Sequence, residues 1–249
     1  MESRGSVAIV TGGSGALGRE IGLALAGAGA HVAVVYARSQ EAAADVAREL
    51  SALGPRALAV RADVADENAV KAMVERVLAE FGRVDILVNN AAFNKWVPYQ
   101  DLDSLTLDLW QKIIGVNATG PFLCCKAVAP TMRRQERGRI VNIASVAGFH
   151  PIGSSIAYSV SKAALVHLTK CMAVALAPHV LVNCAAPGTM EGTRATANLD
   201  PEYAEKARLS ALTGRFTDKA DVAAQVLAFI RSDSTTGQTI VVDGGRVFH

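Results

Sequence analysis

The chain has 249 residues, of which 51% are hydrophobic and 19% are charged, so its composition is that of a folded globular protein rather than a disordered one. Its 25 basic and 23 acidic residues give a net charge of +2, and neither sign forms a long run. This balance argues against binding to nucleic acid or to an anionic membrane surface.

Short apolar segments rich in β-branched residues alternate with longer segments of helical period. They predict strands near residues 7–10, 32–35, 57–60, 86–88, 140–143, 180–182 and 239–242. Between them, helices are predicted near residues 17–28, 40–53, 66–81, 103–116, 120–135, 157–176 and 219–231. This alternation is typical of a doubly wound α/β fold with one seven-stranded parallel sheet and helices on both faces. Because no linker or repeat divides the chain, we expect a single domain over residues 1–249.

Two long uncharged segments, Ile140 to Ser161 and Cys171 to Met190, have the length of membrane spans. Both contain proline, histidine and other polar residues that a lipid-facing helix would not carry, so we interpret them as buried core. The cysteines show no CxxC spacing and are expected to be buried thiols in a reducing compartment; they are Cys124, Cys125, Cys171 and Cys184. These features predict a soluble, cytoplasmic protein.

A glycine-rich turn, Thr11 to Gly18 (TGGSGALG), follows the first predicted strand and opens the first helix. Glycines at a helix N-terminus allow the close backbone approach that a pyrophosphate needs, next to free amides and a positive helix end. No Gly-Lys-Ser/Thr follows, so the turn is not a Walker loop. The sequence also has no Gly-x-Ser-x-Gly elbow, which argues against an α/β-hydrolase. The turn therefore predicts a dinucleotide site.

The end of the second strand bears on which dinucleotide is bound. Folds of this kind that bind NAD usually place an acidic residue there for the ribose 2′-hydroxyl, whereas this chain has Tyr36-Ala37-Arg38-Ser39. Arg38 could pair with a 2′-phosphate that a carboxylate would repel. The alternative is that Arg38 is only a solvated charge at a helix entry. NADP(H) is favoured over NAD(H).

Ser145 ends the fifth predicted strand, and Tyr158 and Lys162 lie four residues apart on the next helix, which places both on one face. A phenol has a reference pKa of about 10. A neighbouring ammonium and a cationic nicotinamide would both lower the pKa of Tyr158. Ser145 could then hold a carbonyl oxygen while Tyr158 moves the proton. The alternative is a surface Tyr/Lys pair that arose by chance.

Together these features resemble the short-chain dehydrogenase/reductase family in its short single-domain form, in particular its 3-oxoacyl reductase-like members. The resemblance spans essentially the whole chain, and its other motifs are Asp63-Val64, Asn89-Asn90-Ala91-Ala92, Asn117 and Pro187-Gly188. It implies a Rossmann fold and hydride transfer between NADP(H) and a carbonyl or secondary alcohol, as in a carbonyl reductase or alcohol dehydrogenase. Tyr158 would be the general acid/base.

The resemblance also implies residue roles. Asn117 would join Ser145, Tyr158 and Lys162 as a catalytic residue, by anchoring a water in the proton relay. Lys162 would bind the nicotinamide ribose. The implied cofactor-binding set is Gly12, Ser14, Gly15, Leu17, Gly18, Tyr36, Arg38, Ser39, Asp63, Val64, Asn90, Ala91, Ala92, Tyr158, Lys162, Pro187, Gly188 and Thr189.

The chain departs from the family pattern at three points. Ala16 stands where the turn usually has its middle glycine, which should be tolerated if its φ is negative. Ala92 replaces a commoner glycine. The basic residue that some NADP-specific members carry inside the turn is absent, and Arg19 lies just after it.

The substrate is left open among ketoacyl thioesters, cyclic or aromatic ketones and sugar-like polyols. Residues about 189–214 are expected to form a mobile flap over the site. Lys95 and Arg194 could meet an anionic group, and the five scattered histidines predict no catalytic metal. The side chains expected to face the substrate are Phe93, Trp96, Ala147, Phe149, His150, Ser155 and Met190.

Three alternatives compete with NADP-dependent reduction. They are an NAD-linked polyol or cyclic alcohol dehydrogenase, a nonenzymatic nucleotide-sensing module, and an epimerase or dehydratase that recycles its cofactor. The resemblance further implies a homotetramer, or a dimer, packed through the helices near 103–135 and 157–176 and the C-terminal strand. Phe248 in the tail could dock on a neighbouring subunit or close the pocket.

Overall fold

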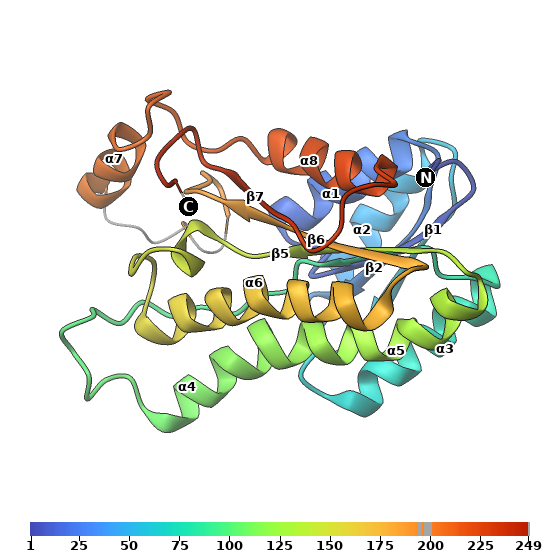
Figure 1. The fold of residues 1–249 in the computed structure, drawn as a ribbon, viewed down its shortest axis with the longest axis horizontal. Coiled ribbons are helices and arrows are strands. Elements are labelled where there is room, and N and C mark those ends of the chain that lie inside the picture. The colour runs from blue at the N-terminus through green and yellow to red at the C-terminus, as the bar shows by residue number, and fades with distance from the viewer. Residues whose placement is uncertain (194–195, 197–200, 249) are drawn as a thin grey trace.

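The computed structural model describes residues 1–193, 196 and 201–248. One seven-stranded, all-parallel sheet has the strand order β3-β2-β1-β4-β5-β6-β7. It lies at the centre of the molecule, between layers of helices (Figure 1). The sequence-based prediction of a doubly wound α/β fold is confirmed. The strands are β1 (Val7–Thr11), β2 (His31–Tyr36), β3 (Ala57–Arg61), β4 (Ile86–Asn89), β5 (Gly138–Ile143), β6 (Val180–Pro187) and β7 (Thr239–Val242).

Helices cover both faces of the sheet (Figure 1). On one face lie α1 (Ala16–Gly27), α2 (Gln40–Ser51) and α8 (Lys219–Arg231), and on the other α3 (Glu67–Phe81), α4 (Leu107–Ile114), α5 (Gly120–Arg134) and α6 (Ile156–Leu176). Each face has its own apolar core, the first around Ile21, Leu50 and Phe229, the second around Met73 and Met132. The sheet is therefore covered by packed apolar side chains on both faces.

The order of the strands locates a crevice in this sheet. β1 pairs with β2 on one side and with β4 on the other, so the chain leaves β1 and β4 toward opposite faces. A gap opens where the connections diverge, just beyond the carboxyl ends of the strands, and ligands of doubly wound folds bind there.

The two helices predicted near 103–116 and 120–135 form one continuous helical stretch, which differs from the prediction. Thr106 caps α4 by accepting a hydrogen bond from the Leu109 N–H at 3.3 Å, so the helix begins at Leu107 rather than near 103. A π-helical segment, η1 (Gly115–Thr119), then joins α4 to α5. Pro121 has no N–H to offer the Asn117 carbonyl four residues earlier, so regular α spacing cannot continue through this point.

The region predicted to be a flap contains a helix that the sequence analysis missed. Helix α7 (Pro201–Leu209) has proline at its first position, Glu202 in its first turn, and Lys206 and Arg208 in its last turn. These are favourable positions for proline and for charges along the helix dipole. Residues 194–195 and 197–200 of the predicted flap lie outside the described residues.

Two helical stretches, Leu107–Arg134 and Ile156–Leu176, are long and apolar enough to span a membrane by length and composition alone. Half of the most apolar window of the first, and 44% of that of the second, is buried inside the protein. Both stretches cover the sheet, and this burial is typical of core helices.

The cysteines were predicted to be buried free thiols, and three of the four are. All four are free, and Cys124, Cys125 and Cys184 are buried. Cys171 is exposed on α6, so the expectation that it is buried is wrong.

Candidate active site

A cleft of about 530 Å³ lies at the carboxyl ends of the strands. Loops after β1, β2, β3, β4, β5 and β6 all contribute to its walls. Every residue of the cofactor-binding set predicted from the sequence lines it, together with Ser145 of the predicted catalytic set. The topology of the sheet therefore gathers motifs that are more than 170 residues apart in the sequence.

The glycine-rich turn is closely packed at its glycines. Gly12 has φ +63°, and a Cβ on Gly18 would lie 2.3 Å from the Gly12 carbonyl oxygen. Ala16 is the first residue of α1, and Glu136 is the only described non-glycine residue with positive φ. The condition under which Ala16 is tolerated in place of glycine is therefore met.

The Asn89-Asn90-Ala91-Ala92 motif at the end of β4 holds this turn in place. The Asn90 side-chain amide donates to the carbonyls of Thr11, at 3.0 Å, and Gly12, at 3.2 Å. In return, the backbone N–H groups of Asn90 and Ala91 both donate to the Thr11 hydroxyl oxygen at 3.0 Å. The loops after β1 and β4 thus form one rigid unit at the point where the strand order reverses.

The cleft fits a dinucleotide. No side chain in the described part of the chain caps the N-terminus of α1, and Ala16, Leu17 and Gly18 at this end line the cleft. Free N–H groups and the positive end of a helix dipole suit a pyrophosphate. At the far end of the cleft, Arg38 is exposed, and Asp63 forms a tight turn by accepting the Ala65 N–H at 3.0 Å.

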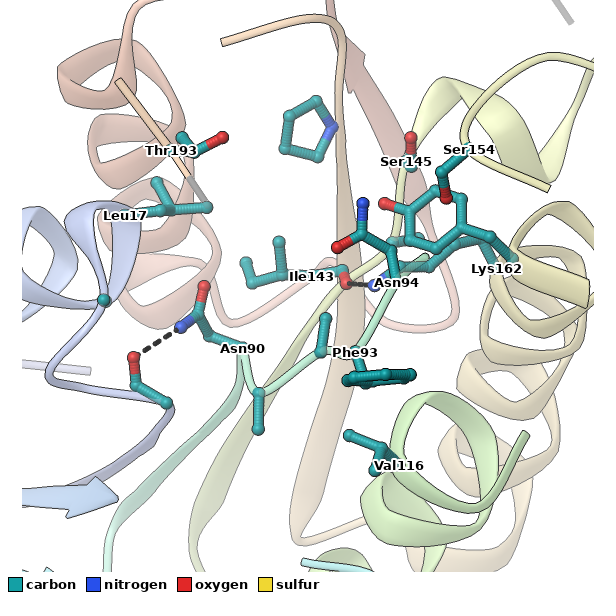
Figure 2. A pocket seen from close by; sticks show the side chains of 18 of the residues that line it. Leu17, Asn90, Phe93, Asn94, Val116, Ile143, Ser145, Ser154, Lys162 and Thr193 are labelled. Carbon is teal, nitrogen blue, oxygen red and sulfur yellow. Dashed lines mark hydrogen bonds between the residues drawn. The ribbon is translucent and has the colours of Figure 1, made fainter. Parts of the chain in front are cut away.

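Lys162 is buried at the other end of the cleft. Its side chain crosses to β5, where Nζ donates to the Ile143 carbonyl at 2.8 Å, as Figure 2 shows. The residue is 2% exposed, and this burial lowers the pKa of Lys162 to about 8. The ammonium lies 5.7 Å from the centroid of the Tyr158 ring, so the phenol and the cation share one end of the cleft.

The pKa of Tyr158 was predicted to be lowered, whereas in the structure it is raised. Burial raises it above the usual value, and a hydrogen bond with Ser145 opposes this rise. The predicted lowering by Lys162 is not found in the polypeptide itself, because the Lys162 ammonium is committed to the Ile143 carbonyl and lies beside the ring. A raised pKa keeps the phenol protonated at neutral pH, which suits a proton donor.

Asn117 does not line the cleft, although it was predicted as a catalytic residue. It is fully buried, and its side chain binds both backbone groups of Phe93, accepting from N at 2.8 Å and donating to O at 2.9 Å. It also donates to the Ser161 hydroxyl at 3.0 Å. The side chain therefore ties the loop after β4 to α6, and a water-anchoring role of Asn117 stays a prediction.

The predicted substrate residues divide into two groups. Phe93, Trp96, Ala147 and Met190 line the cleft, whereas the other three do not. Ser155 is fully buried and caps α6 by accepting the Tyr158 N–H at 3.2 Å. Phe149 packs on the apolar cluster around Leu165 behind the short 3₁₀ turn η2 (Val146–Gly148), and His150 is exposed outside the cleft. Lys95 does not line the cleft either, and Arg194 lies outside the described residues.

Several residues that line the cleft were missed, among them Asn94, Lys112, Ser154 and Arg246. Arg246 donates to the Thr189 hydroxyl at 3.2 Å, so the C-terminal tail reaches the cleft through an arginine. Phe248 is 75% exposed and does not line the cleft, so it does not close the pocket as one prediction had it. No sequence motif marks these residues, because loops distant in sequence bring them together.

Comparison with known proteins identifies the family. The short chain dehydrogenase family pattern matches residues 6–204. The chain belongs to this family. It is 40% identical over 250 residues to a 3-oxoacyl-[acyl-carrier-protein] reductase from Synechocystis, an alignment that covers 97% of this chain and 96% of the relative.

Solved structures of the family have the same fold. A short-chain type dehydrogenase/reductase from Mycobacterium marinum superimposes with a TM-score of 0.91 at 36% identity, covering 98% of this chain and 96% of that one. An NAD⁺-bound xylitol dehydrogenase does so with a TM-score of 0.90 at 30% identity, covering 98% and 100%. The protein is an NAD(P)-dependent oxidoreductase that acts on alcohol or keto groups, similar to 3-oxoacyl reductases.

The lowered pKa of Lys162 predicts a pH dependence. The side chain is cationic below about pH 8 and loses its charge above it. Because kcat/KM for the nicotinamide cofactor reports the free enzyme, we expect this constant to be nearly level from about pH 6 to about pH 7, below the pKa of Lys162. Above about pH 8 it should fall, approaching tenfold per pH unit if only the cationic form is productive. Steady-state kinetics with varied cofactor measures this.

A variant on the surface provides the control. Lys71 lies on α3 and is well exposed, so the Lys71→Gln variant should show the same fall in kcat/KM above about pH 8 as the unsubstituted enzyme. A kcat/KM that stays level up to pH 9.5 in the unsubstituted enzyme would show that the charge of Lys162 does not matter.

Proposed function

We propose that the enzyme reduces a carbonyl group with NADPH, and that Tyr158 donates the proton to the carbonyl oxygen. The observation that carries this proposal is the burial of Lys162 against the Ile143 carbonyl, one helical turn from Tyr158. Burial of an ammonium is costly, and ionisable groups whose pKa is strongly shifted by burial cluster at functional sites. The phenol beside it is protonated at neutral pH, as reduction requires.

Three side chains of the protein would have separate roles in the reduction. When bound, NADPH would supply the hydride. Ser145 and Tyr158 line the same end of the cleft, and these two hydroxyls would bind the carbonyl oxygen between them. Tyr158 would give its proton to that oxygen as negative charge develops there. Lys162 would stabilise the phenolate that remains and bind the ribose hydroxyls.

The preference for NADPH rests on the end of β2. Arg38 is exposed there, and no acidic residue stands between Tyr36 and Ser39 to bind a ribose 2′-hydroxyl. Arg61 at the end of β3 is the register partner of Tyr36 and adds a second positive charge to this edge of the sheet. Of the two cations only Arg38 lines the cleft, and a cation at the end of β2 with no carboxylate between Tyr36 and Ser39 favours a 2′-phosphate.

For the substrate, the sequence relatives favour a ketoacyl compound. A 3-oxoacyl-[acyl-carrier-protein] reductase is 40% identical over almost the whole chain, and Phe93, Trp96 and Met190 give the cleft apolar walls that an acyl chain could contact. The second candidate is an NAD-linked polyol dehydrogenase, which the similarity to an NAD⁺-bound xylitol dehydrogenase favours. We also propose a cytoplasmic location, which the four free cysteines support.

We further propose that the protein assembles as a homotetramer. Large apolar side chains are exposed on the elements that the sequence analysis named, with Phe122 on α5 43% exposed, Val174 on α6 82% and Ile240 on β7 39%. The exposed tail residue Phe248 could dock on a neighbouring subunit. Contiguous exposed apolar patches mark contact surfaces, and in the proposed assembly these side chains would lie at the subunit contacts.

Replacement of Tyr158 tests the proton donor. Tyr158→Phe should fold and bind NADPH with an affinity close to that of the unsubstituted enzyme, since only one hydroxyl is lost. Its kcat with a reactive ketone should fall about 10²- to 10⁴-fold, the usual contribution of a general acid. Near-normal turnover by this variant would remove Tyr158 from the mechanism.

Replacement of Arg38 tests the cofactor preference. Arg38→Asp exchanges attraction to a 2′-phosphate for repulsion, so the ratio of kcat/KM for NADPH over NADH should fall about 10- to 100-fold. Arg48→Asp is the matched control, because Arg48 is exposed near the other end of α2 and does not line the cleft. A ratio unchanged by Arg38→Asp would show that this arginine does not contact the phosphate.

Light scattering tests the assembly. The purified chain should show the mass of a tetramer, and Val174→Glu, which places a charge on the exposed face of α6, should shift it toward smaller species. A monomer-sized mass for the unsubstituted chain would contradict the proposed assembly.

A further inference from the structure

Two polar side chains at the Tyr158 end of the cleft have no hydrogen-bond partner in the part of the chain that the structure describes. Ser154 lines the cleft, is only 9% exposed, and its hydroxyl oxygen is buried without a partner. Asn94 lines the cleft from the loop after β4, and its side-chain amide makes no hydrogen bond to a described residue. Buried polar groups are normally satisfied, so the unsatisfied Ser154 hydroxyl beside the cleft points to a ligand, and the half-buried Asn94 amide lines the same cleft as a second polar group.

The backbone around both side chains is firmly held. The two hydrogen bonds between Asn117 and Phe93 fix the residue that precedes Asn94. The Val97 N–H donates to the Ser154 carbonyl at 2.7 Å, which joins the two loops. The Tyr99 hydroxyl donates to the Ile152 carbonyl at 3.0 Å and strengthens this connection. A preorganised pair of this kind binds a partner without a large loss of conformational entropy.

The pair also lies next to the reacting groups. Gly153, directly before Ser154, is so close to the phenol that a Cβ there would lie 3.2 Å from Cδ1 of Tyr158 and 3.2 Å from Cβ of Ala147. Figure 2 shows Ser154, Asn94 and Ser145 gathered on the side of the cleft where Lys162 lies. A substrate whose carbonyl oxygen reaches Ser145 therefore passes both unpaired side chains.

We propose that Asn94 and Ser154 form a second polar subsite, which binds an oxygen of the substrate other than the one that is reduced. This inference rests on the proposed function and specifies its substrate class, namely a ketone with a further carbonyl, ester or hydroxyl oxygen close to the reacting carbon. The Asn94 amide can both donate and accept. The Ser154 hydroxyl reaches the cleft by rotation about its single side-chain torsion. Both are specificity-determining residues rather than proton donors.

The test compares two ketones of equal chain length with the full-length enzyme and NADPH. Ethyl acetoacetate has a second carbonyl oxygen two carbons from the keto carbon, and 2-heptanone has none. Asn94→Leu and Ser154→Ala should each lower kcat/KM for ethyl acetoacetate about fivefold, the scale of one lost hydrogen bond. For 2-heptanone the change should stay within about twofold, because this ketone makes no contact with either polar group.

Matched variants and stability measurements exclude a merely structural role. Asn68→Leu and Ser104→Ala repeat the two exchanges outside the cleft and should change neither rate. Ser154→Ala should leave the thermal unfolding temperature unchanged or raise it, because it removes an unsatisfied buried hydroxyl. A marked drop in that temperature would show that the hydroxyl has a partner within the protein and would overturn the subsite.

The kinetic results distinguish failure of the proposed subsite from failure of the proposed reductase function. Equal losses for both ketones, or no loss for either, in an enzyme that turns over both would overturn the subsite alone. An unsubstituted enzyme that oxidises NADPH with neither ketone would count against the proposed function, and the subsite would fall with it.

Discussion

The burial of one ammonium group constrains the architecture of this site. Transfer of a charged amine out of water costs several kcal/mol even after the protein relaxes, and only well-placed partners offset that cost. Lys162 has such a partner in the Ile143 carbonyl at 2.8 Å, at the last residue of β5. For this bond to form, α6 must lie against the carboxyl end of the sheet. Tyr158, one turn earlier on α6, is thereby placed beside Ser145.

The other elements of the site follow from similar local contacts. Asn90 and Thr11 join the loops after β4 and β1, so that the glycine-rich turn and the α1 N-terminus keep one position relative to the sheet. Asn117 joins the loop after β4 to α6 from the opposite side. The dinucleotide end and the chemical end of the cleft are thus connected through a single loop, residues 90–97. Movement of that loop would disturb both ends together.

The sequence was sufficient for the fold because its signals are local and strong. Seven β-branched segments of the right length, each followed by a helical pattern, admit few arrangements other than a parallel sheet. The residues that the family resemblance implies for cofactor binding all line one cleft. Glycine is required there at Gly12, where φ is positive, and at Gly18, where a Cβ would meet the Gly12 carbonyl oxygen. The start of α4 was predicted near residue 103, whereas the Thr106 side chain caps the helix and makes Leu107 its first residue.

What could not be read from the sequence depends on contacts between distant loops. Ser155 looked like a substrate contact and proved to be a helix cap, while its neighbour Ser154 lines the cleft. A shift of one residue along the chain decides which of these two adjacent serines lines the cleft, and no pattern in the sequence specifies that shift. The pKa of Tyr158 likewise depends on how deeply the ring is buried, which only the folded environment determines.

A crystal structure of the enzyme with NADPH bound would test the central claim most directly. The account predicts that the Tyr158 hydroxyl and the Lys162 ammonium both face the nicotinamide end of the cofactor, with the hydroxyl in hydrogen-bonding reach of the place where a carbonyl oxygen would bind. A phenol turned away from the nicotinamide, with the ammonium released from Ile143 into solvent, would contradict it.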